Sequence, residues 1–284
     1  MLAFKSHITL EPENVLAGNW NTEASFYDWI GVSCSRRRQR VTSLNLSFMN
    51  LQGTISPHFA NLSFLMLLDL HNISFHGQIP ETVGCLRCLR TINLLYNQLE
   101  GIIQLSLAQC RKLQLVMMQN NHLQGNIPVE MGNLLDLHIL DVGNNDLRGN
   151  IPSTIFNIST LRYITLLDNS LSNSLPMDMF LNLPRLEYLF ISINQLSGQI
   201  PTNLCQCKSL RQINLWQNSF TGSIPKDIEC LSKLEFLNLS DNQLIDIVPP
   251  SLGNLSRLAY LDFRDNNLWG QIPLQLAQPS NLHF

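Results

Sequence analysis

The side chains best suited to metal binding, redox chemistry and nucleophilic attack are seven cysteines and seven histidines, in a chain of 284 residues. Cys85 and Cys88 form a Cys-x-x-Cys motif, and Cys205 and Cys207 form a Cys-x-Cys motif. Either spacing could supply two ligands of a zinc site. Whether both motifs could bind one ion depends on the elements that position them.

A catalytic arrangement is not found in the sequence. The histidines are scattered, and there is no His-Glu-x-x-His motif, no glycine-rich phosphate loop and no kinase signature. We therefore expect no catalytic residue, no metal and no cofactor, and we expect that the chain is not an enzyme.

The charge balance argues against nucleic acid as a partner, and the hydropathy of the chain argues against a membrane span within it. The chain has 18 Lys and Arg against 21 Asp and Glu, a net charge of -3, which gives no electrostatic reason to expect nucleic acid. The basic run over residues 36–40 has no interleaved aromatic residue, so a solvated loop is expected there. No apolar run is long enough to cross a bilayer, so a membrane contact is expected only through a missing C-terminal span. No signal peptide follows Met1.

A repeat of 24 residues organises almost the whole chain. Its pattern, Leu-x-x-Leu-x-Leu, begins ten times, and every step is 24 residues except one of 25. The starts are Val41, Leu65, Leu89, Leu113, Leu137, Leu161, Leu186, Leu210, Leu234 and Leu258. The predicted organisation is a cap over residues 1–40, ten repeats over 41–281 and the start of an eleventh over 282–284.

Each repeat start predicts a strand, because its apolar and polar residues alternate. Strands of successive repeats would pair in parallel at about 4.8 Å, so the repeats would stack into a solenoid. Five repeats, or roughly 24 Å of such a stack, separate the two cysteine motifs, which excludes one shared metal site.

An asparagine stands eight positions after most repeat starts. At a fixed corner of every coil its amide can bond backbone groups of its own and the adjacent coil. The predicted ladder consists of Asn97, Asn121, Asn145, Asn169, Asn194, Asn218, Asn242 and Asn266. Met49 and Ile73 occupy this position in the first two repeats, where we expect a weaker or shifted ladder.

A glycine and then an Ile-Pro pair complete most repeats. Glycine permits a tight bend, and proline fixes φ and favours extended structure before it, so the return side should be extended or a short strand. Ile55-Ser56 and Ile103-Gln104 lack the proline and are expected to mark less regular coils.

The full repeat, Leu-x-x-Leu-x-Leu-x-x-Asn-x-Leu-x-Gly-x-Ile-Pro, resembles the plant-specific class of leucine-rich repeat. The segments Leu2–Lys5, Trp20-Asn21 and Trp29–Cys34 resemble that family's N-terminal cap. The chain is most similar to ectodomains of plant receptor-like kinases, in particular the immune-receptor subfamily that includes flagellin and elongation-factor sensors. The resemblance implies an α/β repeat solenoid, a curved superhelix with a parallel β-sheet on its concave face and a helical N-terminal cap.

The function that this resemblance implies is extracellular recognition of a peptide or protein ligand in defence signalling, with a co-receptor leucine-rich-repeat kinase as a second partner. The full receptor would add a membrane span and a Ser/Thr kinase, neither of which this sequence contains. The location would be the extracellular face of the plasma membrane, or the chain would be secreted. Two alternatives are a secreted inhibitor of a cell-wall-degrading glycosidase and a degenerate fragment that binds nothing.

Seven cysteines is an odd number, so at least one is unpaired within the chain. The resembled caps usually pair a cysteine at the position of Tyr27 with that of Cys34, so this cap should be less robust. Cys110 and Cys207 stand where leucine is usual, which favours buried thiols. Disulfides between neighbouring coils (Cys85–Cys110 or Cys207–Cys230) and metal binding are the alternatives.

Six Asn-x-Ser sequons are candidate glycosylation sites if the chain is secreted. They begin at Asn45, Asn61, Asn72, Asn157, Asn238 and Asn254.

Large aromatic and charged residues mark repeats 6 to 10 at positions that point out of the predicted concave face. Exposed aromatics with arginine are typical of a protein-binding hot spot, and a smooth sheet suits an extended peptide better than a small molecule. The alternative is that the aromatics only pack on one another across coils. The candidate ligand-binding residues are Arg162, Tyr163, Tyr188, Phe190, Arg211, Trp216, Phe236, Tyr260 and Arg264.

Overall fold

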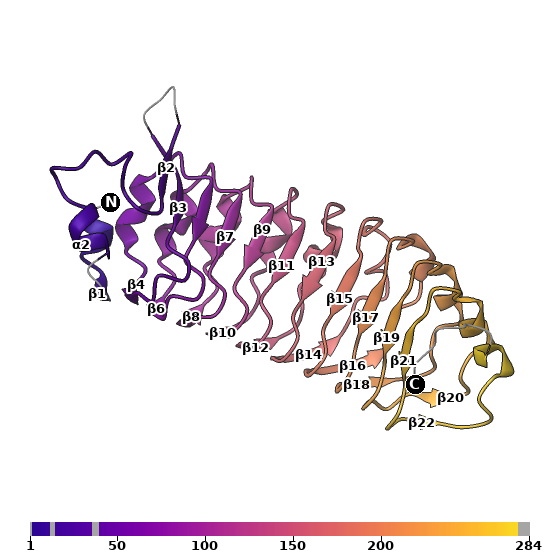
Figure 1. Ribbon diagram of the computed structural model, residues 1–284. Coiled ribbons are helices and arrows are strands. Elements are labelled where there is room, and N and C mark those ends of the chain that lie inside the picture. The colour runs from indigo at the N-terminus through magenta and orange to yellow at the C-terminus, as the bar shows by residue number, and fades with distance from the viewer. Residues whose placement is uncertain (1, 12–14, 36–39, 278–284) are drawn as a thin grey trace. The chain divides into compact units, whose positions relative to one another are not determined.

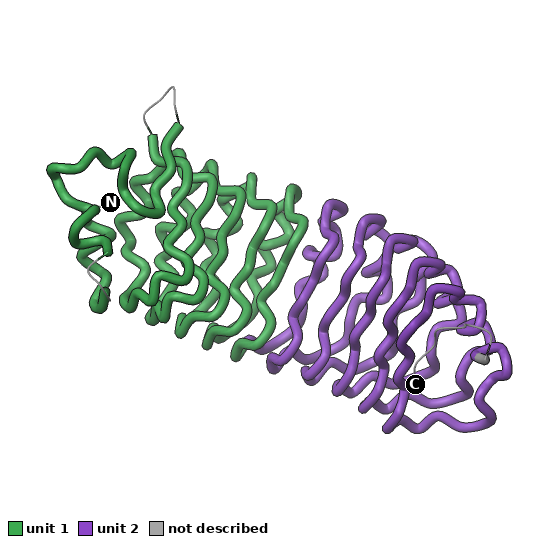
Figure 2. The backbone as a smooth tube through the Cα atoms, in the orientation of Figure 1, with its two compact units in different colours: residues 1–146 green, residues 147–284 purple. Residues whose placement is uncertain are grey.

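The computed structural model describes residues 2–11, 15–35 and 40–277, and it divides into two compact units, residues 1–146 and 147–284 (Figure 2). The expected start of an eleventh repeat and most of the basic run lie outside the described residues. Both units are stacks of coils with the same plan. Each coil contributes one strand to a long sheet, and most add a strand on a second side and a 3₁₀ helix (Figure 1).

The long sheet of unit 1 is parallel except at its first strand. β2 pairs antiparallel with β3, and from β3 onward each strand pairs in register with the strand one repeat later, as Thr91 does with Leu115. In spatial order the strands are β2 (Val32–Cys34), β3 (Val41–Asn45), β5 (Leu67–Asp69), β7 (Thr91–Asn93), β9 (Leu115–Met117) and β11 (Ile139–Asp141).

The return side of unit 1 has short strands and 3₁₀ helices, and its described repeats contain no α-helix. The strands are β1 (Ile8–Leu10), β4 (Gln52–Thr54), β6 (Phe75–Gln78), β8 (Gln98–Ile102) and β10 (His122–Gly125). The 3₁₀ helices are η2 (Pro57–Asn61), η3 (Glu81–Cys85), η4 (Leu105–Gln109) and η5 (Val129–Asn133).

Unit 2 repeats the plan, and β12 (Asp146–Gly149) lies at the boundary in sequence. Its long sheet runs β13 (Tyr163–Thr165), β15 (Tyr188–Phe190), β17 (Gln212–Asn214), β19 (Phe236–Asn238) and β21 (Tyr260–Asp262). On the second side lie β14 (Ser170–Ser174), β16 (Gln195–Gln199), β18 (Ser219–Thr221), β20 (Ile245–Asp246) and β22 (Asn267–Leu268). The 3₁₀ helices are η6 (Ser153–Asn157), η7 (Leu204–Gln206), η8 (Lys226–Cys230), η9 (Pro250–Asn254) and η10 (Leu274–Ala277).

The core of each unit consists of the leucine positions of the repeat. The leucines at repeat starts are almost fully buried, as Leu89 and Leu234 show, and the isoleucine of the Ile-Pro pair closes the core on the return side, as Ile79 does. Burying this much apolar surface in every coil is the main stabilising term of such a stack.

Three aromatic residues of the N-terminal segment pack together and anchor it on the first coils. The rings of Trp20 and Trp29 stack with centroids 5.5 Å apart, and Phe4 lies 6.3 Å from both Trp20 and Phe75 of β6. Lys5 donates to the carbonyls of Leu16 and Trp20 at 3.1 and 3.0 Å. The helices here are short, α1 (Leu2–Lys5) and α2 (Val15–Asn19), so a helical cap stays an expectation of the sequence.

The backbone at the two positions that lack proline is as regular as at the prolines of neighbouring coils, which corrects the sequence expectation there. Gln104 has φ -67° and ψ 130°, close to Pro80 at -63° and 138° and Pro128 at -63° and 135°. Ser56 has φ -65° and ψ 131°, and its hydroxyl accepts from the backbone of His58. The stacked neighbours hold these residues in the conformation that proline would impose.

The single 25-residue repeat places its extra residue on the return side. Between Pro176 and Leu186 the backbone forms successive turns where the other coils of unit 2 form a 3₁₀ helix. The sheet register is unaffected, because Tyr163 still pairs with Tyr188. In the described part of the chain, no helix has the length and apolar character needed to span a bilayer.

Candidate ligand-binding face

The outward side chains of the long sheet of unit 2, together with the residue just before each strand and the turn residues that follow it, form a surface that we call the unit 2 face. Strand alternation explains which side chains reach it, since in β15 the central Leu189 is buried while Tyr188 and Phe190 are half-buried. All nine predicted ligand-binding residues lie on this face.

The aromatic residues form two separate groups. Tyr163 lies 5.6 Å from both Tyr188 and Phe190 between ring centroids, and Tyr188 lies 6.3 Å from Phe190. Two coils further on, Phe236 and Tyr260 stack with centroids 4.5 Å apart and planes at 6°. Each ring is only half-buried, so both groups present apolar surface that a partner could cover.

Trp216 belongs to neither group. Its indole Nε1 donates to Oδ2 of Asp241 on the next coil at 2.5 Å. The hydrogen bond holds the half-buried indole toward the coil that carries Asp241.

Arg162 and Arg211 belong to a ladder of alternating charge along one edge of the sheet. Arg162 lies 3.7 Å from Glu187, Arg211 lies 3.8 Å from Glu187, and Arg211 lies 3.1 Å from Glu235. The four side chains come from four successive coils, one from each. Because these groups are partly exposed, each pair contributes little to stability, on the order of 1 kcal/mol or less.

Arg264 is clamped by Asp262 of β21. Its Nε donates to Oδ1 at 3.0 Å and its terminal nitrogen to Oδ2 at 2.7 Å, so both carboxylate oxygens are engaged. The hydroxyl of Tyr260 also donates to Oδ2 at 3.3 Å. The hydrogen bond from Arg264 lowers the pKa of Asp262, while burial and the nearby carboxylate raise the pKa of Tyr260.

Sequence reasoning missed Asp262, although the signal was present. The residue lies two positions before Arg264, and strand geometry places residues i and i+2 on the same face. With its side chain 4% exposed, Asp262 is the buried partner of an arginine whose own side chain is 78% exposed.

The corresponding surface of unit 1 carries smaller side chains, among them Ser43, Leu67 and Thr91. It also holds Asp141, which is buried at the end of β11. Burial raises the pKa of Asp141 to about 6, and the backbone N–H of Gly143 lowers it only partly.

The asparagines of the predicted ladder bond their own coil and the one before it. Oδ1 of Asn121 accepts from the backbone of Leu99 at 3.0 Å, and its Nδ2 donates to the carbonyls of Leu94, Met118 and Gln119. In every case Oδ1 accepts from a backbone N–H of the previous coil and Nδ2 donates to carbonyls. The asparagines concerned are Asn97, Asn121, Asn145, Asn169, Asn194, Asn218, Asn242 and Asn266.

The residue just before each ladder asparagine has a left-handed backbone, as Asn120 (φ 59°) and Asp241 (φ 51°) do. In the second coil the same conformation falls on Asn72 (φ 54°), before buried Ile73, and again on Ser74 (φ 60°). Asn72 therefore occupies the turn position and not the ladder position.

Comparisons with known proteins identify the type of repeat that builds this architecture. A family model described as Leucine Rich Repeat matches residues 40–62, 136–158, 185–207, 209–231 and 233–255. The chain is a leucine-rich-repeat solenoid. Five separate matches at the predicted period confirm the fold class inferred from the sequence.

The relatives of this leucine-rich-repeat chain include plant receptor kinases. The LRR receptor-like serine/threonine-protein kinase EFR of Arabidopsis thaliana is 48% identical over 84 residues, which is 30% of this chain and 8% of that protein. The Arabidopsis receptor kinase HAESA, solved with the peptide hormone IDA and the co-receptor SERK1, has a TM-score of 0.84 at 31% identity, covering 96% of this chain and 46% of that one. A plant ice-binding protein has a TM-score of 0.81 at 25% identity, covering 96% and 86%.

Most cysteines of the leucine-rich-repeat coils are free thiols. Cys110 and Cys207 are fully buried free thiols, which confirms the interpretation based on their leucine position. Burial raises the pKa of Cys110 to about 11 and that of Cys207 to about 12. Cys34 and Cys85 are free as well. Among the described residues no group of His, Cys, Asp or Glu is arranged to hold a metal ion.

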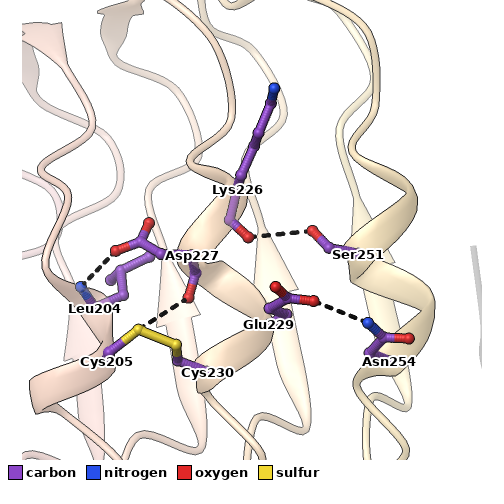
Figure 3. The surroundings of a disulfide bond; sticks show 8 residues. All are labelled: Leu204, Cys205, Lys226, Asp227, Glu229, Cys230, Ser251 and Asn254. Carbon is purple, nitrogen blue, oxygen red and sulfur yellow. Dashed lines mark hydrogen bonds between the residues drawn. A yellow bond between two sulfur atoms is a disulfide. The ribbon is translucent and has the colours of Figure 1, made fainter.

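One disulfide joins adjacent coils, with a pairing that is neither of the two alternatives considered from the sequence. Cys205 of η7 bonds Cys230 of η8, with Cα atoms 4.9 Å apart (Figure 3). The alternative pair Cys207–Cys230 is not formed, because the Sγ of Cys207 points inward to the carbonyls of Phe180 and Leu183 at 3.3 and 3.2 Å. The alternative pair Cys85–Cys110 is not formed either, since both residues are free.

The sequons divide by exposure. Asn238 is buried in β19, and its Oδ1 accepts from the backbone and hydroxyl of Ser240 at 3.0 and 2.7 Å. A glycan on this nitrogen would have to pass through packed side chains, so burial argues against Asn238. The exposed sequon asparagines are Asn45, Asn61, Asn72, Asn157 and Asn254.

Proposed function

We propose that this chain is ligand-recognition ectodomain sequence of a plant receptor-like kinase, and that the unit 2 face binds an extended peptide or protein segment. The observation that carries the proposal is the pair of half-buried aromatic groups, Tyr163 with Tyr188 and Phe190, and Phe236 with Tyr260, on a regular open sheet. Rigid aromatic rings offer large apolar contacts with little ordering cost, which suits an extended chain that crosses both groups.

The comparisons support a receptor more than the fold alone does. A leucine-rich-repeat solenoid also occurs in an ice-binding protein, so architecture does not select the function. EFR is named as a receptor-like kinase, and HAESA was solved with a peptide hormone and a co-receptor. By analogy, the proposal includes a co-receptor leucine-rich-repeat kinase as partner and, from the resemblance to immune receptors, a role in defence signalling.

An extracellular location, on the plasma membrane or after secretion, is part of the proposal. The disulfide Cys205–Cys230 supports it, because such bonds persist mainly in oxidising compartments. The five exposed sequons fit the same location, since glycans are attached in the secretory pathway.

The test selects binders from a phage-displayed library of random 12-residue peptides on the immobilised chain. The variant carries Tyr188→Ala, Trp216→Ala and Tyr260→Ala, and the matched control carries Met177→Ala, Leu181→Ala and Ile245→Ala, which remove exposed apolar groups away from the face. We expect peptides enriched on the wild type and the control to lose at least about tenfold in affinity for the face variant, as hot-spot truncation does. Unchanged affinity together with lowered thermal stability would show that the rings serve packing only.

A further inference from the structure

Every arginine on the unit 2 face already has a carboxylate partner. Arg162 and Arg211 pair with the glutamates of the charge ladder, and Arg264 is held by both oxygens of Asp262. A ligand carboxylate could reach one of these guanidinium groups only by displacing an existing partner. The face therefore has little capacity left for an anionic ligand.

The carboxylates of the same face are in excess. Three arginines stand against six acidic residues (Asp168, Glu187, Glu235, Asp241, Asp262 and Asp265), a formal charge of -3. Three of the six form no ion pair with any Lys, Arg or His in the described ranges, namely Asp168, Asp241 and Asp265. All three are exposed.

Backbone geometry presents these three carboxylates in one row. Each stands in the left-handed position before a ladder asparagine, with φ of 52°, 51° and 52° for Asp168, Asp241 and Asp265. The backbone N–H of Asn242 donates to the backbone carbonyl of Asp265 at 3.1 Å, so Asp241 and Asp265 lie on directly stacked coils. A cation placed on this side of the turns would be attracted by both carboxylates.

One aromatic side chain contacts one of these carboxylates, and two more lie on the same coils. Trp216 is fixed beside Asp241 by its indole hydrogen bond, and Phe236 and Tyr260 stack on the coils that carry Asp241 and Asp265. A guanidinium or ammonium group that approaches the carboxylates can also lie against an aromatic ring, a contact that gains about 0.5–2 kcal/mol depending on its exposure.

We infer that the segment bound by the unit 2 face is a basic peptide, with arginine or lysine side chains at the Asp241–Asp265 row and apolar side chains on the aromatic groups. The inference rests on the proposed function and adds the charge class of the ligand. Acidic peptides, and peptides that bind through a free carboxylate, are disfavoured because the arginines that would receive them are already paired.

The peptide-display selection described above also tests the charge class, and the two conclusions can fail separately. We expect the sequences that depend on the face to carry net positive charge. Face-dependent sequences that are neutral or acidic would overturn the basic-ligand inference and leave the proposed function intact. Enrichment that does not depend on the face, or no enrichment, would overturn both.

A quantitative comparison uses one enriched peptide and the same peptide with each arginine replaced by the uncharged isostere citrulline, or each lysine by norleucine. Affinity is measured by fluorescence anisotropy on the wild type and on Asp241→Asn with Asp265→Asn. The control, Asp136→Asn with Asp178→Asn, removes the same charge from exposed sites off the face. We expect about a tenfold loss on the face variant and on neutralising the peptide, little change on the control, and weaker binding as salt rises. Equal losses on both double variants would assign the effect to net charge and overturn the site.

Discussion

One amide side chain satisfies four backbone groups in each regular coil. Oδ1 of Asn242 accepts from the backbone of Phe220 at 3.0 Å, and Nδ2 donates to the carbonyls of Leu215, Leu239 and Ser240 at 3.0 to 3.1 Å. Truncation would leave these buried groups without partners. We expect Asn242→Ala to lower the free energy of unfolding by roughly 3 kcal/mol, measured by urea denaturation.

The matched control for that substitution is Asn267→Ala, at an exposed position of β22. It should change the unfolding midpoint little, because surface substitutions usually stay within about 0.5 kcal/mol. Equal effects of the two substitutions would contradict a special role for the ladder amide.

Asp141 should make the stability of unit 1 depend on pH. Burial raises its pKa in the folded chain to about 6, above the ordinary value of 3.8 for an aspartate, so the folded state binds the proton more tightly. The stabilisation is complete below about pH 4 and is lost as pH rises through 6, by up to about 3 kcal/mol. We expect Asp141→Asn to unfold at higher urea concentration than the wild type at pH 8 and at nearly the same concentration at pH 4.

The control for this prediction is Asp178→Asn, an exposed carboxylate. It should change the unfolding midpoint little, because surface substitutions usually stay within about 0.5 kcal/mol. An effect of Asp141→Asn that is the same at pH 4 and pH 8 would contradict the raised pKa of Asp141.

At the scale of the element, the extended conformation before η4 is kept although proline is missing there. Gln104 has φ -67°, within the range that proline fixes. We expect Gln104→Pro to raise the free energy of unfolding by about 0.4–1 kcal/mol by restricting the unfolded chain, measured by thermal denaturation. Leu107→Pro, three residues on, should destabilise strongly, since the backbone N–H of Leu107 donates to Gln104 at 3.0 Å.

The disulfide reinforces the shortest 3₁₀ helix. η7 has three residues where η8 has five. The residue just before η7, Asn203, has a left-handed backbone conformation. Around the bond, Asp227 accepts from the backbone of Leu204, so a covalent and a polar link join the same two coils (Figure 3). The bond spans 25 residues.

Closing a loop of that length stabilises by about 3 kcal/mol in the chain-entropy description. We expect a reducing agent to lower the thermal unfolding midpoint of the wild type to that of Cys205→Ser with Cys230→Ser. The double variant itself should not respond to the reductant. A wild type that is insensitive to reduction while the double variant is destabilised would assign the effect to packing.

At the scale of the whole molecule, the pattern of sequon exposure predicts a pattern of glycans. When the chain is directed into a secretory pathway by an added signal peptide, glycopeptide mass spectrometry should find glycans at exposed asparagines such as Asn61 and Asn157. Asn238 should be unmodified, because a chain glycosylated there could not close its sheet around the buried residue. Secreted, folded protein with a glycan at Asn238 would contradict the packing of β19.

The repeat period was sufficient to predict the fold. The spacing of leucines places the long-sheet strands from β3 onward, and glycine with Ile-Pro correctly indicates a return side without long helices. The regularity of the coil at Gln104 could not be predicted locally, because neighbouring coils and not its own side chain hold its backbone. The partner of Cys230 was misassigned because Cys205 and Cys207 are two residues apart but face opposite sides of the coil wall.

For the candidate face, the sequence places residues on the surface but not their contacts. Alternation assigns Tyr188 and Tyr260 to the outward side, whereas the tilt of Trp216 toward Asp241 depends on side-chain packing between coils. The pairing of Arg264 with Asp262 changes the role of an arginine that composition alone suggests for ligand binding.

The alternation of Arg162, Glu187, Arg211 and Glu235 limits how this array can change its length. Excising one coil from this stretch would set two arginines or two glutamates side by side, whereas excising two adjacent coils would restore opposite neighbours. We therefore expect coils in this stretch to be duplicated or deleted in pairs, because an even number keeps each charge beside an opposite charge along the edge of the sheet.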